Sequence, residues 1–234
     1  MKSNKLNLVI LSVLMITIGV SPALVMAQDQ VDENDIVDMV ERNVVPTIKK
    51  TEISGTPYVT DDFTSGSFEV YSGRYANAEY MNFNIYEERL EYRSGNQTYG
   101  VDLANIRQFK LSVDGTERLY KRGYDSRRLD GDEFVEVAAE GPLTFLIKHE
   151  VNFNENASSG YGSATKQASY SKNERYYFKE GDKVSNVRRL NERRVMRYFE
   201  GSNAIESFID QNNLDMSNPR DVARAVAKFN ELNM

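Results

Sequence analysis

Hydrophobic and polar residues alternate along much of residues 55–151, with Gly, Asp and Asn at the breaks between runs. This period of two predicts consecutive β-strands joined by turns. Met81, Phe83 and Ile85 alternate with polar neighbours, which predicts a strand with one apolar face and one face rich in amide side chains. A later run with the same period ends at Asp114-Gly115, a residue pair that suits the positive φ angles of a two-residue hairpin turn.

A further strand is predicted around residues 143–151, and the residues that share its inward face are Leu143, Phe145, Ile147, His149 and Val151. Residues 154–173 are rich in Asn, Ser, Gly and Ala and show no period, which predicts a long mobile loop. Residues 176–187 then predict a last hairpin with its turn at Gly181-Asp182.

Helical spacing occurs at the two ends of this β-rich region. Residues 32–45 carry apolar residues at four-residue steps after an acidic start, and Pro46 ends the predicted helix. Asn203, with Glu206 three residues later, predicts the start of a second helix, and Asn218-Pro219 predicts the start of a third. The apolar stripe of the third consists of Val222, Ala225, Val226, Phe229 and Leu232.

These elements predict an α+β protein with a mainly antiparallel sheet of roughly eight to ten strands, which can be strongly curved. A short N-terminal helix and the C-terminal helices are expected to pack on the sheet. The predicted organisation is a signal peptide over residues 1–27 and a single β-rich domain over 28–234, whose helical segment covers about 188–234.

The amino terminus has the pattern of an export signal. Lys2 and Lys5 precede an apolar stretch of 13 residues, Leu8–Val20, whereas a membrane-spanning helix needs about 20. Val25-Met26-Ala27 predicts cleavage between Ala27 and Gln28 and release of a periplasmic or extracellular protein with no transmembrane segment. Cleavage removes two lysines and no acid, which lowers the net charge from −6 to −8.

Composition excludes several kinds of chemistry. The net charge of −6 argues against nucleic acid as a partner, because phosphate backbones repel an acidic protein. The absence of cysteine excludes disulfides, thiol nucleophiles and cysteine-based metal sites. A single histidine leaves little zinc or histidine chemistry, so no metal or cofactor is expected.

Candidate catalytic and metal-binding groups each have a simpler interpretation. His149 has the chemistry of a general base, but an inward-facing strand position is typical of a hydrogen-bonded core histidine. Ser163 with Lys166, and Ser169 with Lys172, match a serine–lysine motif without its helical setting. The three acidic residues Asp130, Asp132 and Glu133 are too few for calcium and suit a turn. We therefore assign no catalytic, cofactor or metal residue.

Five arginines crowd one segment near the C-terminal end of the sheet: Arg188, Arg189, Arg193, Arg194 and Arg197. Apolar residues between them allow a basic amphipathic helix that contacts an anionic membrane surface or an acidic partner. The alternative is the solvated face of a packed helix.

Several short motifs resemble those of a group of uncharacterised secreted proteins of Bacteroidota. They are Gly55-Thr56-Pro57-Tyr58, Asp62-Phe63 with Gly66, Met81-Asn82-Phe83-Asn84-Ile85-Tyr86, and the closing segment from Leu214 to Asn230. The chain departs from their pattern at Phe83, where a tyrosine is expected. The resemblance implies export and a β-rich body, and it supplies no catalytic residues because the group has no assigned activity.

Three functions stay open at the level of sequence. The first is a non-enzymatic exported protein that binds another protein or an envelope component. The second is a periplasmic carrier that holds a lipid or other apolar ligand inside a curved sheet. The third is a hydrolase whose carboxylates are brought together only by the fold.

Overall fold

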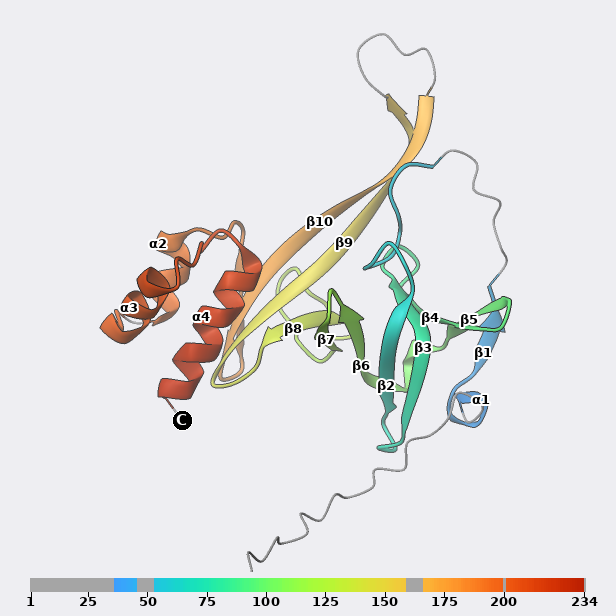
Figure 1. Ribbon diagram of the computed structural model, residues 1–234, viewed down its shortest axis with the longest axis horizontal. Coiled ribbons are helices and arrows are strands. Elements are labelled where there is room, and N and C mark those ends of the chain that lie inside the picture. The colour runs from blue at the N-terminus through green and yellow to red at the C-terminus, as the bar shows by residue number, and fades with distance from the viewer. Residues whose placement is uncertain (1–35, 46–52, 159–165, 200, 234) are drawn as a thin grey trace, which may run out of the picture.

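The computed structural model describes residues 36–45, 53–158, 166–199 and 201–233, which form one twisted antiparallel sheet with helices at its C-terminal end (Figure 1). Within these residues the sheet has eleven strands in the order β1-β5-β4-β3-β2-β6-β7-β8-β9-β10-β11. The strands are β1 (Arg42–Val44), β2 (Thr64–Val70), β3 (Tyr75–Asn84), β4 (Arg89–Ser94), β5 (Gln97–Val101), β6 (Ile106–Val113), β7 (Thr116–Lys121), β8 (Val135–Ala139), β9 (Leu143–Ser158), β10 (Lys166–Glu180) and β11 (Lys183–Val187). The helices are α1 (Ile36–Met39), η2 (Leu103–Asn105), α2 (Glu192–Val195), η3 (Met196–Phe199), α3 (Asn203–Gln211) and α4 (Pro219–Leu232).

The predicted α+β class, antiparallel pairing and C-terminal helices are confirmed, whereas the strand number is higher than expected. The sheet is not closed, since β1 and β11 lie at its two edges. The predicted signal peptide, residues 1–27, lies outside the described residues.

Turn chemistry correctly located two hairpins. Asp114 and Gly115 have φ angles of 52° and 74° and join β6 to β7. Gly181, with φ 55°, lies in the turn between β10 and β11, where Tyr176 pairs with Val187. Both turns match the right-handed twist of the flanking strands.

The predicted helix over residues 32–45 is wrong in its second half. Its described part, α1, ends at Met39, and Arg42–Val44 instead form β1 against β5. The backbone N–H of Val45 donates to the carbonyl of Thr98 at 2.9 Å. Pro46 explains the change, because a residue before proline favours extended backbone, and the edge of β5 supplies the hydrogen bonds that a helix would have made.

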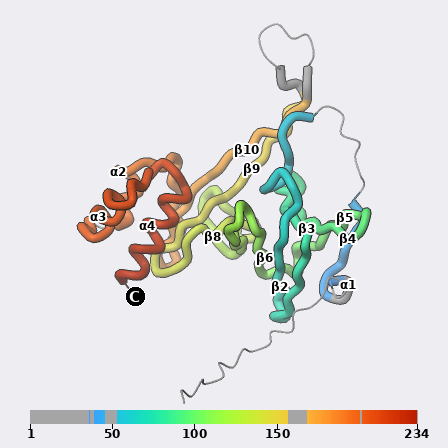
Figure 2. The backbone as a smooth tube through the Cα atoms, viewed as in Figure 1, coloured from blue at the N-terminus to red at the C-terminus, as the bar shows by residue number. Residues whose placement is uncertain are grey.

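The predicted loop over residues 154–173 is also wrong, because its described parts belong to β9 and β10. These strands form a long hairpin that projects beyond the sheet (Figure 2). Phe153 pairs with Tyr170, and their ring centroids are 4.8 Å apart. A projecting two-stranded ribbon has solvent on both sides, so its sequence needs no hydrophobic alternation, and polar composition is a poor sign of a loop there.

The inward face predicted for residues 143–151 is confirmed. Phe145 and Ile147 are buried in a cluster with α3 and α4, while Leu146 lies in a separate cluster on the opposite face with Tyr177. Helix α4 packs over β8 and β9. Of its predicted stripe, Val222, Ala225 and Val226 are buried, but Leu232 is 51% exposed because it lies at the end of the helix.

The helix starts were predicted with mixed success. Asn218 is the N-cap of α4 and accepts a hydrogen bond from the backbone N–H of Arg220, with Pro219 following, as expected. The N-cap of α3 is Ser202 rather than the expected Asn203, which already lies in the helix.

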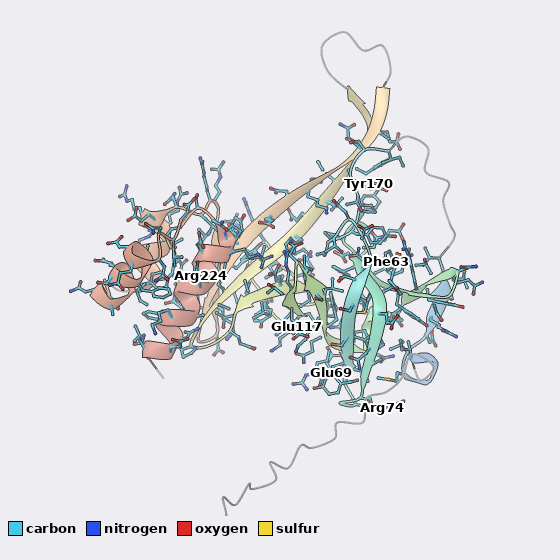
Figure 3. All side chains as sticks on the ribbon, viewed as in Figure 1. Phe63, Glu69, Arg74, Glu117, Tyr170 and Arg224 are labelled. Carbon is cyan, nitrogen blue, oxygen red and sulfur yellow. The ribbon has the colours of Figure 1, made fainter. Side chains whose placement is uncertain are left out.

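Residues 53–63, which we call the strap, account for the first of the resemblance motifs. The Tyr58 hydroxyl donates to buried Glu91 on β4 at 2.9 Å, and Asn82 on β3 donates to the carbonyl of Thr60 at 2.9 Å. The amide-rich face predicted for β3 is therefore buried beneath the strap. The strap also reaches β10, where Tyr170, labelled in Figure 3, donates its backbone N–H to Ser54 at 2.8 Å.

Candidate functional site

A chain of ionised side chains crosses the inward face of the sheet between β8, β10 and α4. His149 Nε2 lies 2.8 Å from Glu136 Oε2, and His149 Nδ1 lies 3.4 Å from Glu174 Oε1. Arg220 of α4 forms an ion pair with the same Glu136. Strand register produces the chain, because Glu174 lies directly opposite His149, while Glu136 pairs with Ile147, two residues before it.

The members of this buried ion-pair chain stabilise one another's charges. Burial by itself raises the pKa of Glu136, whose side chain is 1% exposed, but hydrogen bonds from His149 and Arg220 lower it to about 2. Burial opposes protonation of His149, but hydrogen bonds to Glu136 and Glu174 outweigh it and raise its pKa. The two carboxylates thus favour the protonated form of the imidazole.

This geometry limits what His149 can do chemically. Both ring nitrogens are engaged, so a protonated His149 has no lone pair to accept a proton from a substrate. The interpretation of His149 as a hydrogen-bonded inward histidine is confirmed, and its two partners come from separate strands, β8 and β10.

His149 is one of the residues that line an open cleft. The cleft has a volume of about 540 Å³, which is typical of small-molecule sites. We call it the His149 cleft. Its lining residues are Val59, Ile85, Arg118, His149, Glu150, Lys172, Asn173, Glu174, Tyr176, Arg188 and Arg189. Of these eleven described residues, eight are charged or polar, which makes the lining suited to a polar ligand.

Positive charge predominates in the His149 cleft. Its described lining has four permanently cationic side chains and two carboxylates, an excess of two positive charges, or three with His149 protonated. Both carboxylates are engaged: Glu174 with His149 and Tyr176, and Glu150 with Arg175 at 2.9 Å. The cations therefore dominate the local field of a protein whose net charge is −6.

Arg118 on β7 is the most enclosed of the four permanent cations in this lining. Its side chain is 18% exposed, yet its ion-pair partner, the 91% exposed Asp114, lies 3.8 Å away. The buried Tyr120 hydroxyl, which Arg118 influences electrostatically, makes no hydrogen bond of normal geometry to any described residue. A largely desolvated guanidinium with so distant a partner has hydrogen-bonding capacity left for a ligand.

The five arginines singled out in the sequence divide into two groups. Arg188 and Arg189 follow β11 and line the cleft, whereas Arg193, Arg194 and Arg197 lie on α2 and η3, outside its lining. The expected amphipathic helix is replaced by a bend and two short helical turns. Arg194 donates to the carbonyl of Arg189 at 3.2 Å and so helps to fix this bend.

Arg118 and Lys172 were missed as site residues in the sequence. Arg118 shares an inward strand face with Tyr120. A charged residue on such a face is the sequence feature that could have identified Arg118 as a site residue. Lys172 lay in the predicted loop, but it is on β10, where its ammonium donates to the carbonyl of Val59 at 3.2 Å and pairs with Asp61 at 3.6 Å.

The other candidate motifs have structural roles. Asp130 and Glu133 accept backbone hydrogen bonds within one turn, as expected. No group of three or more potential metal ligands is found in the part of the chain that the structure describes. Ser169 and Lys172 lie on a strand rather than on a helix, and the other serine–lysine pair falls partly outside the described residues.

The ion-pair chain predicts a stability optimum at mildly acidic pH. The contribution of Glu136 is present above its ordinary pKa of 4.5 and is lost as the pH falls toward 2. The contribution of His149 is complete below its ordinary pKa of 6.5 and is lost as the pH rises through its raised value. We therefore expect the urea midpoint to fall between pH 6 and pH 9. The His149→Gln variant should show a smaller fall over this range, and an equal fall in both proteins would contradict the assignment.

Comparisons with known proteins add no relatives: no family model, no curated protein and no solved structure matches the chain. Within the described residues, no helix combines the length and apolar character needed to cross a membrane.

Proposed function

We propose that this chain is an exported, non-enzymatic binding protein that holds an anionic group of a protein or envelope component in the His149 cleft. The observation that supports it is the gathering of Arg118, Lys172, Arg188 and Arg189 on one cleft of an acidic protein. Opposite net charges on the cleft and on the whole surface favour the approach of an anion to this one place. Export is part of the proposal and depends on the pattern of residues 1–27.

The geometry favours this function over a carrier of apolar ligands. The rings of Phe83, Phe109, Tyr120 and Phe134 pack together with centroids 4.7 to 6.4 Å apart and fill the inward face of the sheet. The cleft that is open has a mainly charged lining, which an acyl chain would have to desolvate.

The geometry also gives little support to a carboxylate-based hydrolase. Glu136 and Glu174 do converge, but on His149 rather than on open space. Glu136 is almost completely buried, and hydrogen bonds lower the pKa values of both carboxyl groups. A general acid needs the opposite shift, toward a raised pKa.

The test compares partner capture by the purified protein and by a double variant, Arg188→Glu with Arg189→Glu. Incubation with envelope extract should recover a component with the unaltered protein, and this recovery should fall with the double variant. A matched control, Arg193→Glu with Arg197→Glu, makes the same charge change on exposed arginines outside the cleft. Equal recovery by all three proteins, or turnover in a hydrolase panel that requires Glu174, would overturn the proposal.

A further inference from the structure

We infer that the anionic group held in the His149 cleft is a phosphoryl group, as in a phosphate monoester. This inference rests on the proposed function and specifies the chemistry of its ligand. Three observations support it: the size of the charge excess, the types of cation present and the apolar residues beside them.

The charge excess matches a dianion better than a carboxylate. The described lining has an excess of two positive charges, or three when His149 is protonated. A phosphate monoester carries about −1.5 to −2 near neutral pH, whereas a single carboxylate carries −1 and would leave cations uncompensated. Glu150 and Glu174 already have partners of their own, Arg175 and His149, so they neutralise little of the positive charge that faces the ligand.

The cations are mainly guanidinium groups. Arg118 lies on β7, while Arg188 and Arg189 follow β11, so they approach the cleft from separate parts of the sheet. Each guanidinium offers planar paired N–H donors, a geometry that suits phosphate oxygens. Lys172 adds an ammonium on β10, fixed by the strap carbonyl of Val59. Several donors around one cleft suit a group with three terminal oxygens.

The same cleft has a small apolar side formed by Val59, Ile85 and Tyr176. The Tyr176 ring stacks on Phe145 with centroids 6.2 Å apart, and its hydroxyl donates to Glu174 at 2.8 Å. These residues are placed to contact the carbon part of a phosphate ester. The volume of about 540 Å³ fits a small molecule or a lipid headgroup.

The experiment measures calorimetric binding of glycerol 3-phosphate to the purified protein, with acetate and succinate as carboxylate controls. We expect glycerol 3-phosphate to bind and both carboxylates to bind at least tenfold more weakly. The variant with Arg188→Glu and Arg189→Glu should lose about 10- to 100-fold in affinity, because charge-assisted hydrogen bonds are removed. The control with Arg193→Glu and Arg197→Glu should keep the original affinity within about twofold.

Two further measurements make the result decisive. Arg118→Gln tests the enclosed guanidinium and should weaken binding about tenfold, with its fold checked by circular dichroism. Sedimentation with phosphatidylcholine vesicles, with and without phosphatidic acid, distinguishes a lipid headgroup from a soluble ester. Cosedimentation that depends on phosphatidic acid and on Arg188 and Arg189 supports the headgroup as the source, and its absence alongside binding of glycerol 3-phosphate supports a soluble ester.

The phosphoryl assignment would be overturned if succinate bound as tightly as glycerol 3-phosphate, or if the Arg193→Glu, Arg197→Glu control lost as much affinity as the Arg188→Glu, Arg189→Glu variant. It would also be overturned if neither glycerol 3-phosphate nor phosphatidic acid bound. If envelope capture still depended on Arg188 and Arg189 in that case, the proposed function would stand and only the ligand class would fail. If neither phosphate binding nor arginine-dependent capture from the envelope extract were observed, both proposals would be overturned.

Discussion

Replacement of Glu136 with alanine is expected to lower the free energy of unfolding by about 3 to 5 kcal/mol, the cost typical of removing one partner from a buried ion pair. Glu136 is 1% exposed and holds both His149 and Arg220. Its removal leaves the enclosed His149 with the more distant Glu174 and frees Arg220 from the sheet. Urea unfolding followed by circular dichroism measures the difference.

Glu117 supplies the matched control. It lies on neighbouring β7, is labelled in Figure 3, and pairs with Lys110 at 3.1 Å in a largely exposed ion pair. Glu117→Ala should cost less than about 1 kcal/mol, because solvent screens such pairs. A loss with Glu136→Ala no larger than this would show that the buried ion-pair chain does not anchor α4.

Substitution of Asn230 by alanine is expected to cost about 3 kcal/mol, because it leaves buried backbone groups without partners. Asn230 is 4% exposed and lies near the end of α4. Its side chain accepts from the N–H of Leu143 at 3.0 Å and donates to the carbonyls of Leu143 at 2.8 Å and Glu140 at 3.3 Å. It thus attaches α4 to the start of β9, while Arg220 attaches the other end.

Asn233, three residues later, tests whether the effect depends on burial. Its side chain donates to the carbonyl of Phe229 at 2.7 Å in an exposed position. Asn233→Ala should therefore change the free energy of unfolding by less than about 0.5 kcal/mol. Similar midpoints for the two variants in urea would mean that the Asn230 contacts contribute little to helix docking.

Local pattern was sufficient for elements whose neighbours are close in the chain. The Asp114-Gly115 turn, the hairpin at Gly181 and the Asn218 cap were predicted because each is stabilised by residues within a few positions. The error at residues 42–44 has the opposite cause. This segment becomes strand β1 by pairing with β5, more than 50 positions away, whereas the described parts of residues 154–173 pair locally within the β9–β10 hairpin and were missed because their polar composition lacks hydrophobic alternation.

The residues of the candidate site likewise divide into those that local pattern predicts and those that only tertiary contacts bring together. Alternation along residues 143–151 correctly placed His149 on the inward face. Its carboxylate partners could not be identified, because Glu136 and Glu174 meet it only through the register of three strands. Arg188 and Arg189 were singled out by local charge density, but their separation from the other three arginines required the bend after β11.

The amino-acid sequence by itself determined the antiparallel, β-rich architecture and the faces of its regular strands, because side-chain period and turn residues act over short distances. Only the tertiary structure decided that Arg118, His149 and Lys172 line one cleft and that Glu136 joins His149 to Arg220. Their convergence depends on sheet twist, strand register and the docking of α4, which are collective results of packing between segments distant in the chain.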